Sequence, residues 1–226
     1  MRIATARPVA GAARIARTCA LAAFLATPLA SSLTSSLLAS LLASLLASPA
    51  AAVDLHKSRL SSIDLKQCKR LTSHRATSLI DGASWRCAGI KGYPVYFAEG
   101  DQRHFLAFGP NPQKRRSATQ TLGAFNSIFK GRRRPTIEWR TDTTADGTQA
   151  PFATIMRFYT SHEGVTGEIL VVTKVDPKES CQLAVIDARA NPDAMAIARA
   201  WAIAEARQRP CPDHPEHLGV KGKGPL

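Results

Sequence analysis

The sequence has 226 residues, of which 30 are Lys or Arg and 17 are Asp or Glu, so its formal net charge at pH 7 is +13. It contains no G-x-S-x-G, no P-loop and no G-x-G-x-x-G, which excludes the hydrolases and nucleotide-binding proteins that carry these motifs. The basic excess favours an anionic partner and argues against a basic one such as a lysozyme, because like charges repel at long range.

Residues 1–52 have the pattern of a secretory signal. Four arginines and no acid occupy residues 1–17, and an uncharged segment rich in Leu, Ala and Ser follows. Small residues close it, so we expect cleavage near Ala50 or Ala52 and a periplasmic or secreted mature protein. An uncleaved N-terminal membrane anchor is the alternative, because the apolar part exceeds the usual 7–15 residues or so. Interrupting serines and prolines disfavour a spanning helix of roughly 20 apolar residues.

Alternation of apolar and polar residues predicts strands that follow one another in hairpins. Strands are expected at 83–90, 93–98, 103–108, 135–142, 152–158, 167–175 and 181–187. Residues 61–71 fit either a capped helical turn or a strand, and residues 113–122 have a weak helical pattern. Hairpins that do not alternate with helices predict an α+β fold with a mainly antiparallel sheet.

One C-terminal helix is expected to pack on this sheet. Asn191 has the position of an N-cap, Pro192 that of the first helical residue, and the helix should reach about Gln208. Small and apolar residues recur at helical spacing from Ala194 onward and form a narrow apolar face. Residues 53–211 are therefore expected to form a single exported domain. Residues 212–226 have no apolar periodicity and are expected to be a disordered tail.

Four cysteines follow the signal: Cys68, Cys87, Cys181 and Cys211. An even number in an exported chain indicates disulfides, and four cysteines allow three pairings. The strand at 181–187 rises about 23 Å, and a helix over 192–208 spans roughly 25 Å. A helix folded back on its strand would bring Cys211 to Cys181. The preferred pairs are therefore Cys181–Cys211 and Cys68–Cys87.

Four strings of this sequence resemble a family of exported alphaproteobacterial proteins to which no function is assigned. They are "FGPNPQKRRSATQTLGAFNSIF", "IEWRT", "LVVTKV" and "DARANPDAMAIARAWA" with the cysteine that follows. The resemblance covers about residues 62–211 and implies an exported, disulfide-containing domain. It implies no catalytic residue.

The basic residues are concentrated in one stretch. Between Arg103 and Arg140 the chain has nine Lys or Arg and a single acid, Glu138, whereas the rest of the mature chain is nearly neutral. Such asymmetry creates a local positive potential. We expect an anion-binding surface made by Arg115, Arg116, Arg132, Arg133 and Arg134, through bidentate phosphate contacts.

Aromatic residues lie among these charges and fit two interpretations. Phe105, Phe108, Phe125, Phe129 and Trp139 either line a groove for a ring-bearing anion or belong to a core. The expected partner is an anionic envelope component, such as a phosphorylated lipid headgroup or wall polymer, or a protein. The compartment and the lack of a recognition motif argue against nucleic acid.

We therefore predict a non-enzymatic binding module that needs no cofactor and no metal. The tail residues Cys211, Asp213, His214, Glu216 and His217 are metal-ligating types, but the preferred disulfide uses Cys211. The alternative is an envelope hydrolase of unrecognised type, with its site near Glu99, Asp101 and His104. The sequence does not determine the oligomeric state.

Overall fold

The computed structural model describes residues 57–71 and 82–226. The expected secretory signal, its cleavage near Ala50 or Ala52 and the alternative membrane anchor lie outside these residues. These described residues all belong to one compact unit. No helix within 57–71 and 82–226 is long and apolar enough to cross a membrane.

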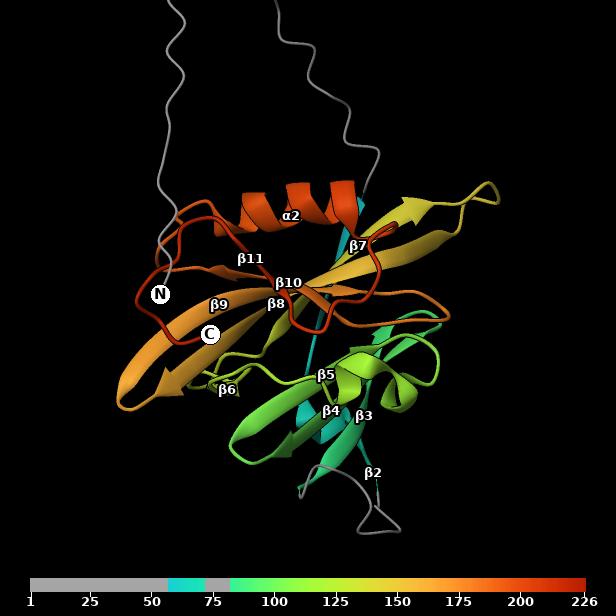
Figure 1. Ribbon diagram of the computed structural model, residues 1–226. Helices are drawn as coiled ribbons and strands as arrows, with labels where there is room; N and C mark the ends of the chain where they lie inside the picture. Colours follow the sequence, from blue (N-terminus) through green and yellow to red (C-terminus); the bar gives the residue numbers. More distant parts are fainter. Residues whose placement is uncertain (1–56, 72–81) are drawn as a thin grey trace, which may run out of the picture. The chain divides into compact units, whose positions relative to one another are not determined.

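Strands dominate this unit, and most of them lie in a seven-stranded sheet (Figure 1). Its strands are β1 (Lys57–Ser62), β6 (Phe125–Ser127), β7 (Thr136–Thr143), β8 (Gln149–His162), β9 (Val165–Lys174), β10 (Gln182–Asp187) and β11 (Glu216–Leu218). The order is β1-β7-β8-β9-β10-β11. The short strand β6 pairs with the C-terminal part of β8, along the edge that β7 pairs with further back. Neighbours are antiparallel except β10 and β11, which are parallel.

A second sheet has four antiparallel strands in the order β2-β3-β4-β5. They are β2 (Lys69–Leu71), β3 (Ser84–Ile90), β4 (Tyr93–Gly100) and β5 (Arg103–Phe108). The β4–β5 turn is tight, because Asp101 and Gln102 both take left-handed backbone angles, with φ of 48° and 57°. The expected antiparallel hairpins are confirmed in both sheets.

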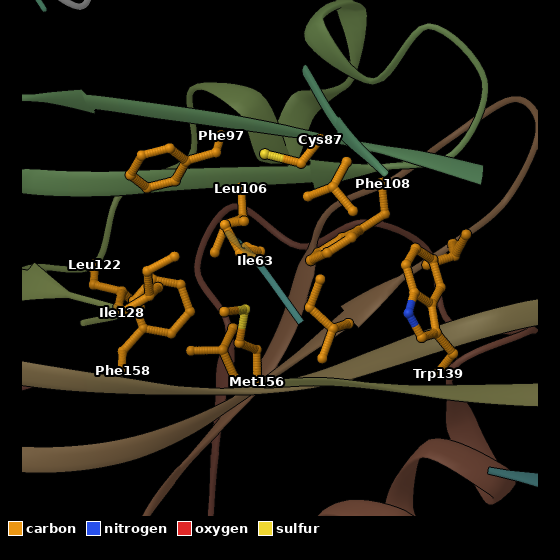
Figure 2. Close-up of a cluster of buried hydrophobic side chains, with 14 of the residues drawn as sticks. Ile63, Cys87, Phe97, Leu106, Phe108, Leu122, Ile128, Trp139, Met156 and Phe158 are labelled. Atoms are coloured by element: carbon orange, nitrogen blue, oxygen red, sulfur yellow. The ribbon is translucent and has the colours of Figure 1, made fainter. Parts of the chain in front are cut away.

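The main hydrophobic core lies between the two sheets (Figure 2). Phe97 and Phe108 enter it from the four-stranded sheet, and Trp139 and Phe158 from the seven-stranded sheet. Alternation along each strand directs every second side chain to this layer. Phe105, Phe108 and Trp139 are all buried, so the expected groove for a ring-bearing anion is wrong at these rings, and the alternative of a core is correct.

The single described α-helix, α2 (Ala194–Glu205), packs on the opposite face of the seven-stranded sheet (Figure 1). Its buried face is made of alanines at i, i+4 spacing, which lets the helix approach the sheet closely: Ala194, Ala198, Ala202 and, just beyond the helix, Ala206. The helix begins two residues later than expected, with Asp193 at the N-cap.

Asn191 does not cap α2, because its side chain is bonded to the C-terminal segment. Its Nδ2 donates to the carbonyl of Val220 at 2.8 Å, and its Oδ1 accepts from the Val220 N–H at 2.9 Å. The prediction of a disordered tail at 212–226 is therefore wrong. Glu216–Leu218 forms β11, and the Leu226 carbonyl accepts a hydrogen bond from Ala124 N–H at 3.0 Å. Backbone pairing orders this segment without an apolar repeat.

Both predicted cysteine pairs are present. Cys181 and Cys211 are bonded, with their Cα atoms 5.8 Å apart, and Cys68 is bonded to Cys87 at a Cα separation of 4.3 Å. The first bond ties the segment after α2 to the start of β10, and the second ties β3 to the residue before β2.

The two uncertain segments are resolved into short pieces. Residues 61–71 contain the end of β1, a 3-10 turn η1 (Leu65–Gln67) and β2, so both alternatives occur in part. Asp64 caps this turn by accepting from the Lys66 N–H at 3.1 Å. Residues 113–122 hold 3-10 turns, η2 (Pro112–Lys114) and η3 (Arg116–Ala118), in place of an α-helix.

Candidate functional site

Arg115 and Arg116 hold loops together in this fold. The Arg115 guanidinium donates to the carbonyl oxygens of Pro110 and Lys178, at 2.9 and 2.8 Å, and also to that of Pro177. Arg116 reaches the segment after α2, where it donates to the Cys211 carbonyl at 3.3 Å and pairs with Asp213 at 2.9 Å.

Arg132, Arg133 and Arg134 lie in the loop between β6 and β7 and are exposed. The loop turns tightly at Gly131, whose φ is +60°, and Lys130 and Arg133 face each other in an antiparallel β-bridge. Residues paired in this way point their side chains to the same face. The turn therefore places two cations, Lys130 and Arg133, side by side.

These two cations stand beside a groove of about 350 Å³ on the same face of the seven-stranded sheet as α2, whose Met195 and Arg199 form part of the lining. The groove is lined by Leu60, Ile128, Lys130, Arg133, Arg134, Pro135, Thr136, Glu138, Ile155, Arg157, Tyr159, Met195 and Arg199. We call it the basic groove. Its size lies at the lower end of the range of pockets that hold small ligands, about 300–1,000 Å³.

A buried ion cluster forms one wall of the basic groove. Glu138 and Arg140 lie two residues apart on β7 and therefore share a face. Arg199 of α2 grips the Glu138 carboxylate through Nε and Nη2, both at 2.8 Å. Ser58 of β1 donates to the same carboxylate at 2.8 Å, and Arg140 Nη1 lies 3.5 Å from it.

These contacts decide the charge of Glu138. Burial by itself would raise the pKa of this carboxyl, but the hydrogen bonds from Arg199 and Ser58 and the charges of Arg199 and Arg140 outweigh burial and hold it below its ordinary value. Glu138 is therefore an anion saturated by its neighbours, and its role at the groove is to hold Arg199 in place.

The other cations of the rim are paired unequally. Lys130 and Arg157 share the Glu168 carboxylate, and Arg134 pairs with Asp64 at 3.1 Å. Among the residues that the structure describes, no carboxylate lies within 4 Å of Arg133.

The basic groove thus keeps an excess of positive charge. Five cations line it (Lys130, Arg133, Arg134, Arg157 and Arg199), and only three carboxylates (Asp64, Glu138 and Glu168) pair with them. Arg132 lies outside the groove and lines an adjoining hollow, which shares Arg133 and Arg134 with the groove.

Sequence reasoning found Arg133 and Arg134 but missed Arg157 and Arg199. Arg157 has a partial signal, because it alternates with Ile155 and Tyr159 on β8 and must share their face. Arg199 has none, since the position of α2 along the sheet is set by packing and the chain sequence does not specify it.

The residues of the alternative hydrolase do not form an acid–base pair. Asp101 pairs with Arg103, and the Nδ1 atom of His104 accepts the Ile128 N–H at 3.1 Å. His104 packs against Phe97 and Phe129, and burial lowers its pKa to about 4. The imidazole is therefore neutral at pH 7, with its lone pair on Nδ1 already used and its proton on Nε2. Glu99 on β4 lies opposite His104 on β5, and both line a hollow that also includes Ser127.

The metal-ligating residue types of the tail are engaged elsewhere or apart. Cys211 is in its disulfide, Asp213 pairs with Arg116, and Glu216 pairs with Arg209. Burial, followed by the charge of Lys221, lowers the pKa of His217, which favours its neutral form. Within 57–71 and 82–226, no three His, Cys, Asp or Glu residues are grouped to hold a metal ion.

Comparison with known proteins identifies no relative of this chain. A scan against protein-family models and searches of curated proteins and of solved structures found no match to this chain.

Proposed function

We propose that this protein is an exported, non-enzymatic binding module that holds an anionic component of the cell envelope in the basic groove. The observation that carries the proposal is the Lys130–Arg133 pair, which a tight turn places side by side at the edge of a groove with excess positive charge. The two disulfides support export, because such bonds persist in oxidising compartments.

The energetics of the pair favour an anion. Like charges directly opposite one another in a β-pair destabilise it. A phosphate or carboxylate between Lys130 and Arg133 would turn this repulsion into two attractions, and the guanidinium of Arg133 can bind either group through two parallel hydrogen bonds. Arg134, Arg157 and Arg199 add positive potential on the same rim.

The hydrolase alternative has less support. Its histidine uses Nδ1 to hold Ile128, and its aspartate is paired with Arg103. Among the described residues, Ser127 is the only one with a hydroxyl side chain that lines that hollow, and it donates to the Phe129 carbonyl at 3.2 Å. These residues are bonded as structural elements of the β5–β6 junction.

The test compares two charge-matched variants in binding to vesicles. In one, Lys130→Gln and Arg133→Gln remove the groove pair. In the other, Lys69→Gln and Arg86→Gln remove a second cation pair, which faces across β2 and β3 on the exposed side of the four-stranded sheet. The oxidised protein is sedimented with vesicles of phosphatidylcholine, with and without about one third phosphatidylglycerol, at about 0.05 and 0.15 M salt.

We expect the groove variant to lose binding to the anionic vesicles by about tenfold or more, and the control variant to lose less than threefold. Binding of the unchanged protein should persist at the higher salt concentration. Equal losses in the two variants would reduce the groove to one part of a generally basic surface and would refute the proposal.

A further inference from the structure

The basic groove has an apolar floor as well as a charged rim. Leu60, Ile128, Ile155 and Met195 line it, and Leu60 is 68% exposed. An apolar side chain of this size, left open to water beside a row of cations, gives nothing to a wholly polar anion. Burying it against a hydrocarbon is favourable, by roughly 25 cal/mol per Å² of apolar area.

Charge and apolar surface are separated along the groove. Leu60 and Met195 come from β1 and α2, at the end that the Glu138–Arg199 pair closes. Lys130 and Tyr159 stand where the basic groove meets a second hollow of about 400 Å³, whose lining mixes hydroxyl and amide side chains such as Ser161 with Phe125 and Arg189. The surface therefore changes from apolar at Leu60 and Met195 to cationic at Lys130 and Arg133, and the second hollow continues it with mixed polar, aromatic and cationic side chains.

The groove accommodates one hydrocarbon chain. If each heavy atom occupies about 30 Å³, the share that a water molecule takes in the liquid, a volume of 350 Å³ holds roughly twelve atoms. This corresponds to a single chain of about ten to fourteen carbons. A phospholipid with two long chains exceeds this volume severalfold.

We propose that the ligand of the basic groove is a single-chain anionic lipid, taken up as a monomer. Its chain lies on Leu60, Ile155 and Met195, and its phosphate binds between Lys130 and Arg133. This inference rests on the proposed function of the groove and adds the chain to it.

The experiment is calorimetric titration of the oxidised protein, below the micellar concentration, with lysophosphatidic acids that carry eight or twelve carbons. Glycerol 3-phosphate is the chainless probe, and dodecyl maltoside is a neutral single-chain probe. Each further methylene should tighten binding about two- to fourfold, so the twelve-carbon lipid should bind at least tenfold more tightly than the eight-carbon lipid. The neutral probe should bind at least tenfold more weakly than the twelve-carbon lipid.

Two variants separate the chain from the phosphate. Leu60→Thr should weaken the twelve-carbon lipid about fivefold and leave glycerol 3-phosphate within twofold, whereas Arg133→Gln should weaken every phosphate ligand by a similar factor. Val220→Thr is the matched control for Leu60→Thr, because Val220 is 64% exposed and does not line the groove. Its affinities should equal those of the unchanged protein.

The outcomes distinguish this inference from the proposed function. If affinity is independent of chain length while Arg133→Gln still weakens binding, the groove binds anions but the chain is refuted. If the protein binds anionic vesicles but none of the monomeric lipids, its partner is a membrane surface, and the inference is overturned as well. If Arg133→Gln changes no phosphate affinity, the proposed function itself fails.

Discussion

Arg115 and Arg133 belong to the same basic stretch, and the structure uses them in opposite ways. The Arg115 guanidinium donates to three backbone carbonyl groups on two loops. Arg133 is exposed, stands beside another cation and has no carboxylate within 4 Å among the described residues. A cation whose donors are used within the fold stabilises it, whereas one whose donors are open can still bind a ligand.

The largest loss of stability is expected when the two arginines that pair with Glu138 lose its charge. Glu138→Gln removes the charge that Arg140 and Arg199 share, with the carboxylate only 5% exposed. Breaking a buried pair on one side costs about 3–5 kcal/mol. Urea unfolding at pH 7 should show this loss, with Glu99→Gln, an exposed carboxylate, as the control.

The acid range offers a second check on Glu138. Because its pKa is lowered in the folded protein, its contribution to stability is complete above its ordinary pKa of 4.5 and is lost as the pH falls through the lowered value. The difference between the unchanged protein and Glu138→Gln should therefore shrink in strong acid. A difference that is independent of pH would mean that the pair does not depend on this charge.

The direct comparison of the arginines comes next in size. Arg115→Ala should destabilise the fold by about 2 kcal/mol, because several carbonyl groups lose a charged donor. Arg132→Ala, in the exposed loop, should stay within about 0.5 kcal/mol of the unchanged protein. Chemical denaturation measures both, and equal effects would show that hydrogen bonding does not separate the two groups of arginines.

His104 is another ionisable side chain that is bonded within the fold, so its titration should affect stability. Its pKa is lowered by burial from 6.5 to about 4, so the unfolded chain binds a proton at mildly acidic pH while the folded protein does not. Stability should therefore fall between pH 7 and pH 5, by about 1 kcal/mol after allowance for partial exposure. His104→Gln can still accept the Ile128 N–H but should lack this decrease. His217 is present in both proteins and cancels. An equal decrease in both would assign it to other groups.

Local patterns predicted the hairpins and both disulfides, because alternation and spacing are properties of the chain itself. Asn191 and the tail were misjudged for a physical reason. The side chain of Asn191 fits an N-cap by its position, but Val220, which is 29 residues later, competes for it. Such long-range backbone pairing leaves no apolar pattern in the segment that it orders.

The candidate site divides in the same way. The basic stretch was visible in the sequence, and with it Arg133 and Arg134. Which arginines stay available was not visible, because that depends on carbonyl groups as distant as Lys178 and on the position of α2. Charge density predicts a surface, whereas the partners of each donor decide its role.

The smallest effect tests the electrostatic premise of the groove. With no ligand present, Arg133→Gln relieves the repulsion between Lys130 and Arg133 and should stabilise the fold by about 0.2–0.5 kcal/mol at low salt. The gain should vanish near 1 M salt, where charges are screened within about 3 Å.

Thermal unfolding at both salt concentrations measures this gain. The control is Lys69→Gln, which relieves the repulsion between Lys69 and Arg86 and should give the same gain. An equal gain would show that repulsion between two cations does not by itself make a binding site, because only Arg133→Gln should also weaken anion binding. If instead Arg133→Gln destabilises the fold as Arg115→Ala does, Arg133 is another structural cation and the distinction between the two arginines fails.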